Sequence, residues 1–176
     1  MKNIEKLKKK LILRPAINNP KNWFPKRPSQ TEWKILRSLI LERDDNTCVF
    51  CGHQAFSFMN IHHLDVNSKP SNLVTCCVAC HHVLHMGRSL SMNIIGVYKS
   101  EYTQKEIIQK TRQGVRNRVP LHIIRQGLKL ENGEYHPMDL NWANDLLLKI
   151  KNKPIIQLQE PYVVAFHKYV RWQYNQ

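Results

Sequence analysis

Apolar and polar residues are arranged along the middle of the chain in a pattern that predicts a helix followed by a β-hairpin. The helix is expected from Ser29 or Thr31 to about Arg43, because apolar side chains recur there at helical spacing. Two short apolar runs, 56–62 and 73–76, have the length and composition of paired strands. These elements predict a mixed α+β fold.

Further helices are predicted on the C-terminal side of the hairpin. One spans about 78–87, and a second follows a Thr-x-x-Glu capping box and spans about 103–114. A third is bracketed by a proline and a glycine at 121–126. Apolar side chains at helical spacing predict two more helices, at 139–151 and from the proline at 161 to about 170.

The N-terminal part is harder to assign to regular structure. Residues 3–13 fit either a short basic helix or a disordered arm, and the prolines and asparagines of 14–28 predict an irregular segment. The chain of 176 residues suits one compact domain with extensions. We therefore expect a basic arm at 1–30, a core at 31–92 and a mainly helical basic extension at 93–176, packed on the core.

Two Cys-x-x-Cys pairs lie on either side of the predicted hairpin. Cys48 and Cys51 form the first pair, and Cys77 and Cys80 form the second. Each pair makes a tight turn that brings two thiolates to one tetrahedral ion, so the two pairs together predict a closed four-sulfur zinc site.

Histidines add a second group of metal ligands. His81 and His85 are four residues apart and share one face of a helix, so they can bind the same ion. His62 and His63 lie at the end of the first predicted strand, where neighbouring residues point to opposite faces. One of the two is therefore the natural third ligand, and the other is left for a different task.

The order of these residues resembles that of the HNH endonucleases of the zinc-stapled kind, whose core is a β-hairpin and a helix around one metal ion. The resemblance covers roughly residues 33–90. It rests on the motifs Cys48-x-x-Cys51-Gly52, Ile61-His62-His63, Asn72-Leu73-Val74-Thr75, Cys77-x-x-Cys80-His81 and His85.

The resemblance implies an endonuclease that hydrolyses DNA phosphodiester bonds with one catalytic divalent metal. It implies that His62, His81 and His85 hold this ion, that His63 is the general base, and that Asn72 holds the His63 backbone across the hairpin loop. A ligand set of three imidazoles suits Mn²⁺, Ni²⁺ or Co²⁺ better than Mg²⁺. A neutral His63 at cellular pH fits the task of taking a proton from water.

Other interpretations fit the same residues. The cysteines could form a purely structural zinc site in a non-catalytic nucleic-acid-binding module, and RNA could be the substrate of a nuclease. Cys76 is expected to pack as a small apolar residue, with exchange for Cys77 as a ligand as the alternative. His82 is expected outside the metal site.

The charge is strongly positive and unevenly distributed. The formal net charge is +14, and residues 1–37 carry eleven Lys or Arg against Glu5 and Glu32. Basic segments beside a near-neutral core are typical of proteins that bind phosphates, so we expect double-stranded DNA as the partner. The helices at 103–114 and 121–126 would either read DNA or serve as a basic support. The residues expected to contact nucleic acid are Lys8, Lys9, Lys10, Arg88, Lys105, Arg112, Arg116 and Arg118.

The sequence also predicts where the protein resides. It contains no apolar run of membrane-spanning length, and its first residues lack the apolar core of a signal peptide. We therefore expect a cytoplasmic protein with no membrane partner and with reduced, metal-bound thiols. The sequence names no protein partner.

Overall fold

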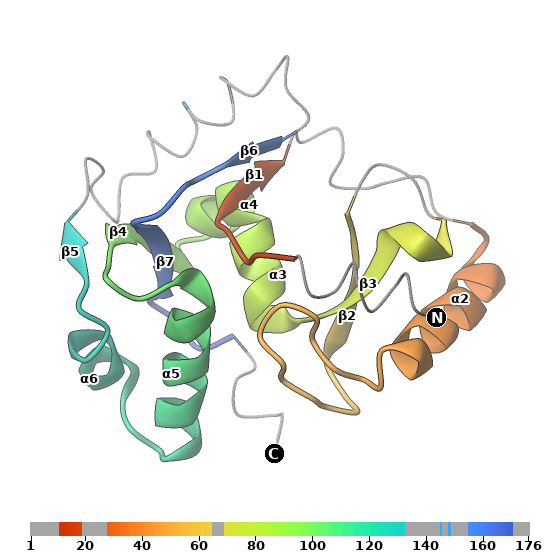
Figure 1. The fold of residues 1–176 in the computed structure, drawn as a ribbon, viewed down its shortest axis with the longest axis horizontal. Coiled ribbons are helices and arrows are strands. Elements are labelled where there is room, and N and C mark those ends of the chain that lie inside the picture. The colour runs from red at the N-terminus through yellow and green to blue at the C-terminus, as the bar shows by residue number, and fades with distance from the viewer. Residues whose placement is uncertain are drawn as a thin grey trace.

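The computed structural model describes residues 11–18, 28–64, 69–132, 145, 148 and 155–170. These residues form a mixed α and β fold with small antiparallel sheets (Figure 1), which confirms the expected class. The helical elements are α2 (Gln30–Arg43), the 3-10 turn η2 (Pro70–Asn72), α3 (Val78–Leu84), α4 (Met86–Ser91), α5 (Gln104–Arg116) and α6 (Leu121–Gln126). The strands are β1 (Ala16–Asn18), β2 (Met59–His63), β3 (Leu73–Cys77), β4 (Ile95–Lys99), β5 (Glu131–Asn132), β6 (Ile155–Gln157) and β7 (Tyr162–Phe166).

Helix α2 begins at a capping box and packs on the hairpin. The Ser29 side chain accepts a hydrogen bond from the Glu32 backbone N–H, and the Glu32 carboxylate accepts one from the Ser29 backbone N–H. The buried Ile40 of α2 meets Ile61 of β2 and Leu73 of β3 in a small apolar cluster. This contact sets α2 against the outside of the hairpin, on the right in Figure 1.

The hairpin leads directly into helix α3. Strands β2 and β3 are antiparallel, with Met59 opposite Cys77 and His63 opposite Leu73. Every residue of β3 is buried. Cys77 ends β3 and is also the N-cap of α3, so no loop separates the hairpin from the helix. The first α3 residues are therefore held close to the hairpin.

The C-terminal half is built on a three-stranded sheet in the order β5-β4-β7. Helix α5 begins at the predicted capping box of Thr103 and Glu106. Its Gln104 donates from Nε2 to the Val164 carbonyl at 3.0 Å and accepts from the Val164 backbone N–H at 2.7 Å. The side-chain amide thus pairs with β7 as a neighbouring strand would, which fixes α5 on this sheet.

Two predictions for the flanking segments are wrong. A helix was expected from 161, but Tyr162–Phe166 is strand β7 and pairs with β4, which was not predicted. Three residues within the segment expected to be irregular form β1 and pair with β6. In both cases the pairing partner lies far away in the sequence, so backbone hydrogen bonds outweigh the local pattern. The helix predicted at 139–151 and the basic residues 3–10 lie outside the described residues.

Candidate metal centres

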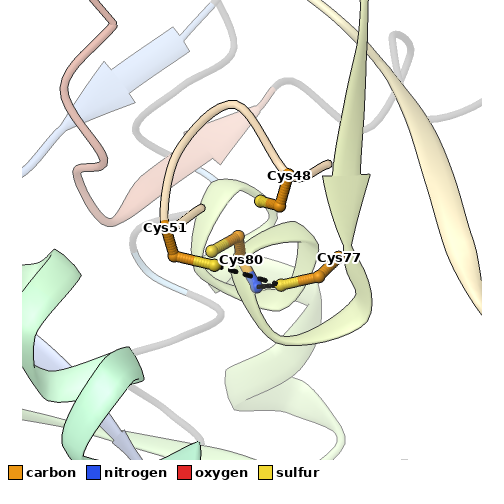
Figure 2. A group of neighbouring side chains, drawn as sticks. All are labelled: Cys48, Cys51, Cys77 and Cys80. Carbon is orange, nitrogen blue, oxygen red and sulfur yellow. Dashed lines mark hydrogen bonds between the residues drawn. The ribbon is translucent and has the colours of Figure 1, made fainter. Parts of the chain in front are cut away.

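Four buried cysteines converge at the junction of the hairpin and α3. The sulfur atoms of Cys48, Cys51, Cys77 and Cys80 all lie within 4.8 Å of one another (Figure 2). The Sγ atoms of Cys51 and Cys77 are 3.7 Å apart. A disulfide would require about 2 Å, whereas two thiolates on one tetrahedral zinc, with Zn–S bonds of about 2.3 Å, lie about 3.8 Å apart. The cluster could therefore bind a structural metal such as zinc, as the cysteine spacing predicted.

The first cysteine pair is held by a tight turn. The Cys48 carbonyl accepts a hydrogen bond from the Gly52 backbone N–H at 2.9 Å, and the Cys48 backbone N–H donates to the His53 carbonyl at 2.8 Å. Gly52 has a φ of +78°, which an L side chain rarely adopts. The Val49 backbone N–H donates to the Thr75 carbonyl at 3.1 Å, so the turn is also fixed to β3.

The second pair uses the first turn of α3. The Cys77 sulfur accepts a hydrogen bond from the Cys80 backbone N–H at 3.5 Å. A helix N-terminus carries partial positive charge, which favours a thiolate there. Cys76 points elsewhere: its thiol donates to the Cys77 carbonyl at 3.4 Å, and its sulfur is not among the four that converge. Cys77, not Cys76, thus belongs to the cluster.

Three histidines form a second cluster on the other end of the same helix. His62 comes from β2, His81 from α3 and His85 from the end of α3, and their ligand nitrogens lie within 4.8 Å of one another. Burial, and then repulsion from His85 and His63 in their protonated forms, lowers the pKa of His62 from 6.5 to about 3. Burial, then the charge of Arg88, lowers the pKa of His85 to about 4. Neutral imidazoles at neutral pH are the form that metal ligands need.

His63 lies outside this cluster. Its ring stacks on that of Trp33 from α2, with ring centroids 5.8 Å apart and planes 6° from parallel. The opposite directions of His62 and His63 follow from the strand, as the sequence predicted. Asn72, expected to hold the hairpin end, lies in η2, and its backbone carbonyl accepts a hydrogen bond from the Leu64 backbone N–H at 2.9 Å.

A residue that the sequence did not single out also reaches the histidine cluster. Asn18 of β1 places Nδ2 3.3 Å from Nδ1 of His85. It arrives there because β1, held by β6, crosses over α3 and α4 (Figure 1). His82 stays apart, as expected, with its Nδ1 2.9 Å from Ser89 Oγ.

One of the residues expected to contact nucleic acid is placed where it cannot do so. Arg112 of α5 is only 7% exposed, and its guanidinium donates from Nη2 to the Cys77 sulfur at 3.3 Å. The expectation failed because Arg112 lies on the inner face of α5. Lys8, Lys9 and Lys10 lie outside the described residues, and the remaining expected contacts are exposed, at Arg88, Lys105, Arg116 and Arg118.

Comparison with known proteins gives one informative relative. No family model matches the chain. The chain is 33% identical over 100 residues to the type 4 apparatus protein DotN of Legionella pneumophila, which corresponds to 52% of this chain and 46% of DotN. The chain thus spans about half the length of this relative.

This relative corrects the functional prediction. DotN is named as an apparatus component and not as a nuclease, so the expected HNH endonuclease activity, with His63 as general base and DNA phosphodiester bonds as substrate, is contradicted. In the part of the chain that the structure describes, no helix has the length and apolar character needed to cross a bilayer.

Proposed function

We propose that the chain is a non-enzymatic subunit of a secretion apparatus, built on a metal-stabilised scaffold and acting by binding other proteins. The similarity to DotN is the observation that carries this proposal. It supports a place for the chain in the same kind of assembly, in which the cysteine and histidine clusters would have a structural task.

The scaffold in this proposal is an HNH-type ββα core without hydrolytic use. The hairpin β2–β3 and the helix α3 supply the arrangement, and the four-cysteine cluster closes it. Stacking of His63 on Trp33 supports the change of use, because a ring packed against an indole is less accessible to a substrate than an open general base.

The histidine cluster would hold a second, structural ion. Three imidazoles favour Zn²⁺, Ni²⁺, Co²⁺ or Mn²⁺ over Mg²⁺, which prefers oxygen ligands. His62 is 8% exposed, His81 and His85 are half-buried, and Asn18 lies against His85, so this ion would be partly enclosed by the protein. Three protein ligands leave the fourth position of a tetrahedral ion open, so the structural task proposed for this ion rests on the similarity to DotN and not on closure of the site.

The exposed apolar residues of α2 are the proposed contact with a protein partner. Ile35 and Leu39 are 59% and 56% exposed and are four residues apart, so they share one face of the helix. Phe56, in the segment before β2, is 88% exposed. Arg37 donates to the Met59 carbonyl at 2.7 Å and so fixes α2 beside the start of β2. Large apolar side chains that remain in water are candidates for an interface.

Site-specific photo-cross-linking in the cell of origin tests this function. A photoreactive residue at Leu39 should cross-link to a protein that mass spectrometry identifies as a secretion-apparatus component. The same residue at Ile123 of α6, which is 45% exposed, is the control and should not give this product. Leu39→Glu should reduce co-purification of the partner, because it places a charge in an apolar contact.

Two results would contradict the proposal. The first is cross-linking from both positions to the same proteins in equal yield, which would indicate non-specific proximity. The second is recovery of the chain on chromosomal DNA without any cross-linked apparatus protein, which would favour the nucleic-acid-binding module. Double-stranded DNA as a partner and a cytoplasmic location both stay predictions. Separation of the cells into chromosomal, membrane and cytoplasmic fractions before mass spectrometry would measure both.

A further inference from the structure

Helix α5 lies against the four-cysteine cluster and contacts both of its halves. Gln109 donates from Nε2 to the Cys51 carbonyl at 3.0 Å, and Arg112 donates from Nη2 to the Cys77 sulfur at 3.3 Å. These two residues are three positions apart and therefore lie on one face of the helix. Although α5 is far from both cysteine pairs in sequence, it bridges the first pair and the second.

With zinc bound, the four-cysteine cluster would carry a buried negative charge, which Arg112 would partly neutralise. Four thiolates around one Zn²⁺ carry a net charge of −2, and the four cysteines are buried. A buried charge is strongly unfavourable unless it is paired and hydrogen-bonded. Arg112 is itself buried and brings one fixed positive charge, with an N–H aimed at a ligand sulfur. It would halve the net charge of the site.

We infer that Arg112 is the built-in counter-charge of the zinc tetrathiolate, and that it makes the docking of α5 dependent on zinc. Residues that donate to metal ligands orient them and tune the affinity of the ion. The dependence is mutual, because the sulfur that accepts from Arg112 is also one of the four sulfurs that would hold the ion. This inference needs metal at the cysteines but is independent of the proposed secretion role and of the partner.

The consequence extends through the C-terminal half. Helix α5 also carries Gln104, which pairs with the backbone of β7, and Gly114, whose Cα packs so close to Ile124 of α6 that an added Cβ would lie 2.5 Å from Cγ1. Loss of zinc should therefore loosen α5 together with the turns that bear the cysteines, and not the turns alone.

Zinc competition with the intact chain tests the counter-charge. Arg112→Met keeps length and apolar bulk but removes charge and donors, so zinc affinity against a chromophoric chelator should fall by roughly 10- to 100-fold. Arg112→Lys restores the charge without the planar fork and should recover part of this loss. Arg116→Met is the matched control, because Arg116 is one turn further along α5 and exposed, and it should bind zinc as the wild type does.

A spectroscopic readout separates this role from simple packing. With Co²⁺ in place of zinc, Arg112→Met should shift the sulfur-to-metal charge-transfer band to lower energy, since the Cys77 sulfur loses a donor. Arg116→Met should leave the band unchanged. Wild-type affinity and an unshifted band in Arg112→Met would overturn the inference, and so would an equal loss of affinity in Arg116→Met.

Hydrogen exchange on the wild-type chain provides a test that does not depend on a folded variant. Removal of zinc by a chelator should increase amide exchange in α5 as well as in the Cys48–Cys51 turn. Unchanged exchange in α5 while the cysteine turns open would show that α5 docks without the ion, and the inference would be wrong.

Discussion

Replacement of Asp44 by asparagine should weaken the contact between α2 and the hairpin. The Asp44 side chain is fully buried and accepts hydrogen bonds from both Arg43 and Thr75. Arg43 donates from Nε to Oδ1 and from Nη2 to Oδ2, both at 2.9 Å, and the Thr75 backbone N–H donates to Oδ2 at 2.8 Å. Asp44 therefore connects the end of α2 to the centre of β3.

The effect of Asp44→Asn can be worked out from these contacts. The amide has the shape of the carboxylate but carries no charge. In wild-type protein both carboxylate oxygens accept hydrogen bonds, so the NH₂ group of asparagine must replace one acceptor and face an N–H donor. One hydrogen bond to a charged group contributes about 1.5–3 kcal/mol. Arg43 keeps the Pro70 and Leu73 carbonyls as acceptors and its side chain is 22% exposed, so its share is reduced. We expect a loss of about 2–3 kcal/mol.

Urea unfolding followed by tryptophan fluorescence measures this loss, with zinc held in constant excess. With an unfolding slope of about 2 kcal/mol/M, the midpoint should fall by about 1 M. Asp45→Asn is the control, because the exposed Asp45 accepts from Gln54 Nε2 at 2.9 Å and asparagine tolerates its positive φ. It should change stability by less than about 0.5 kcal/mol. Equal urea midpoints for Asp44→Asn and Asp45→Asn would show that the Asp44 hydrogen bonds do not hold α2 to β3.

Three further predictions concern the two clusters and the half-buried His167. Cys80→Ser should lose bound zinc and unfold, whereas Cys76→Ala should keep one zinc per chain by elemental analysis; zinc loss in both would mean that Cys76 is a ligand. His81→Ala should abolish the binding of a second transition-metal ion, measured by calorimetry, whereas His82→Ala should retain it. Loss of this ion in His82→Ala but not in His81→Ala would mean that His82 is the ligand. Burial, then Arg125 and Lys168, lowers the pKa of His167 from 6.5 to about 4. The unfolded chain therefore binds this proton first, stability should fall as pH drops from 6.5 to about 4, and His167→Gln should flatten that fall; equal slopes would exclude His167 as the cause.

The elements that the sequence predicted correctly are those with local signals. The α5 N-terminus is marked by Thr103 and Glu106, and α6 lies between Pro120 and Gly127, as predicted. The hairpin strands were read from short apolar runs, and they pair in the structure. Each signal depends on residues a few positions apart, which is why one sequence was sufficient.

Strands β4 and β7 were missed because their stability comes from each other. Ile95 pairs with Phe166 and Lys99 with Tyr162, across more than sixty residues. The run at 162–166 also fits an apolar helix that starts at Pro161, so its own pattern did not decide between helix and strand. Only the partner strand, which satisfies its backbone groups, decides.

The same distinction applies to the candidate metal centres. The cysteines, His81 and His85 were found because metal-ligand spacing is a local property, whereas the choice of His62 over His63 came from the family resemblance. Asn18 and Arg112 were not found as neighbours of these ligands, since β1 and α5 bring them there by tertiary packing. Arg112 was instead expected at a nucleic acid, because a sequence reports charge but not the direction in which a helix faces.

Helix α3 carries ligands of both clusters, so loss of metal from one cluster should affect metal binding at the other, and more strongly in one direction. Its N-cap and first turn supply Cys77 and Cys80, and the rest of the helix supplies His81 and His85. Removal of zinc releases the start of α3, which must displace the histidines that follow in the same helix. Loss of the histidine-bound ion leaves the cysteine end held by β3 and the Cys48–Cys51 turn. Zinc at the cysteines should therefore be required for metal at the histidines, while the reverse requirement should be weak.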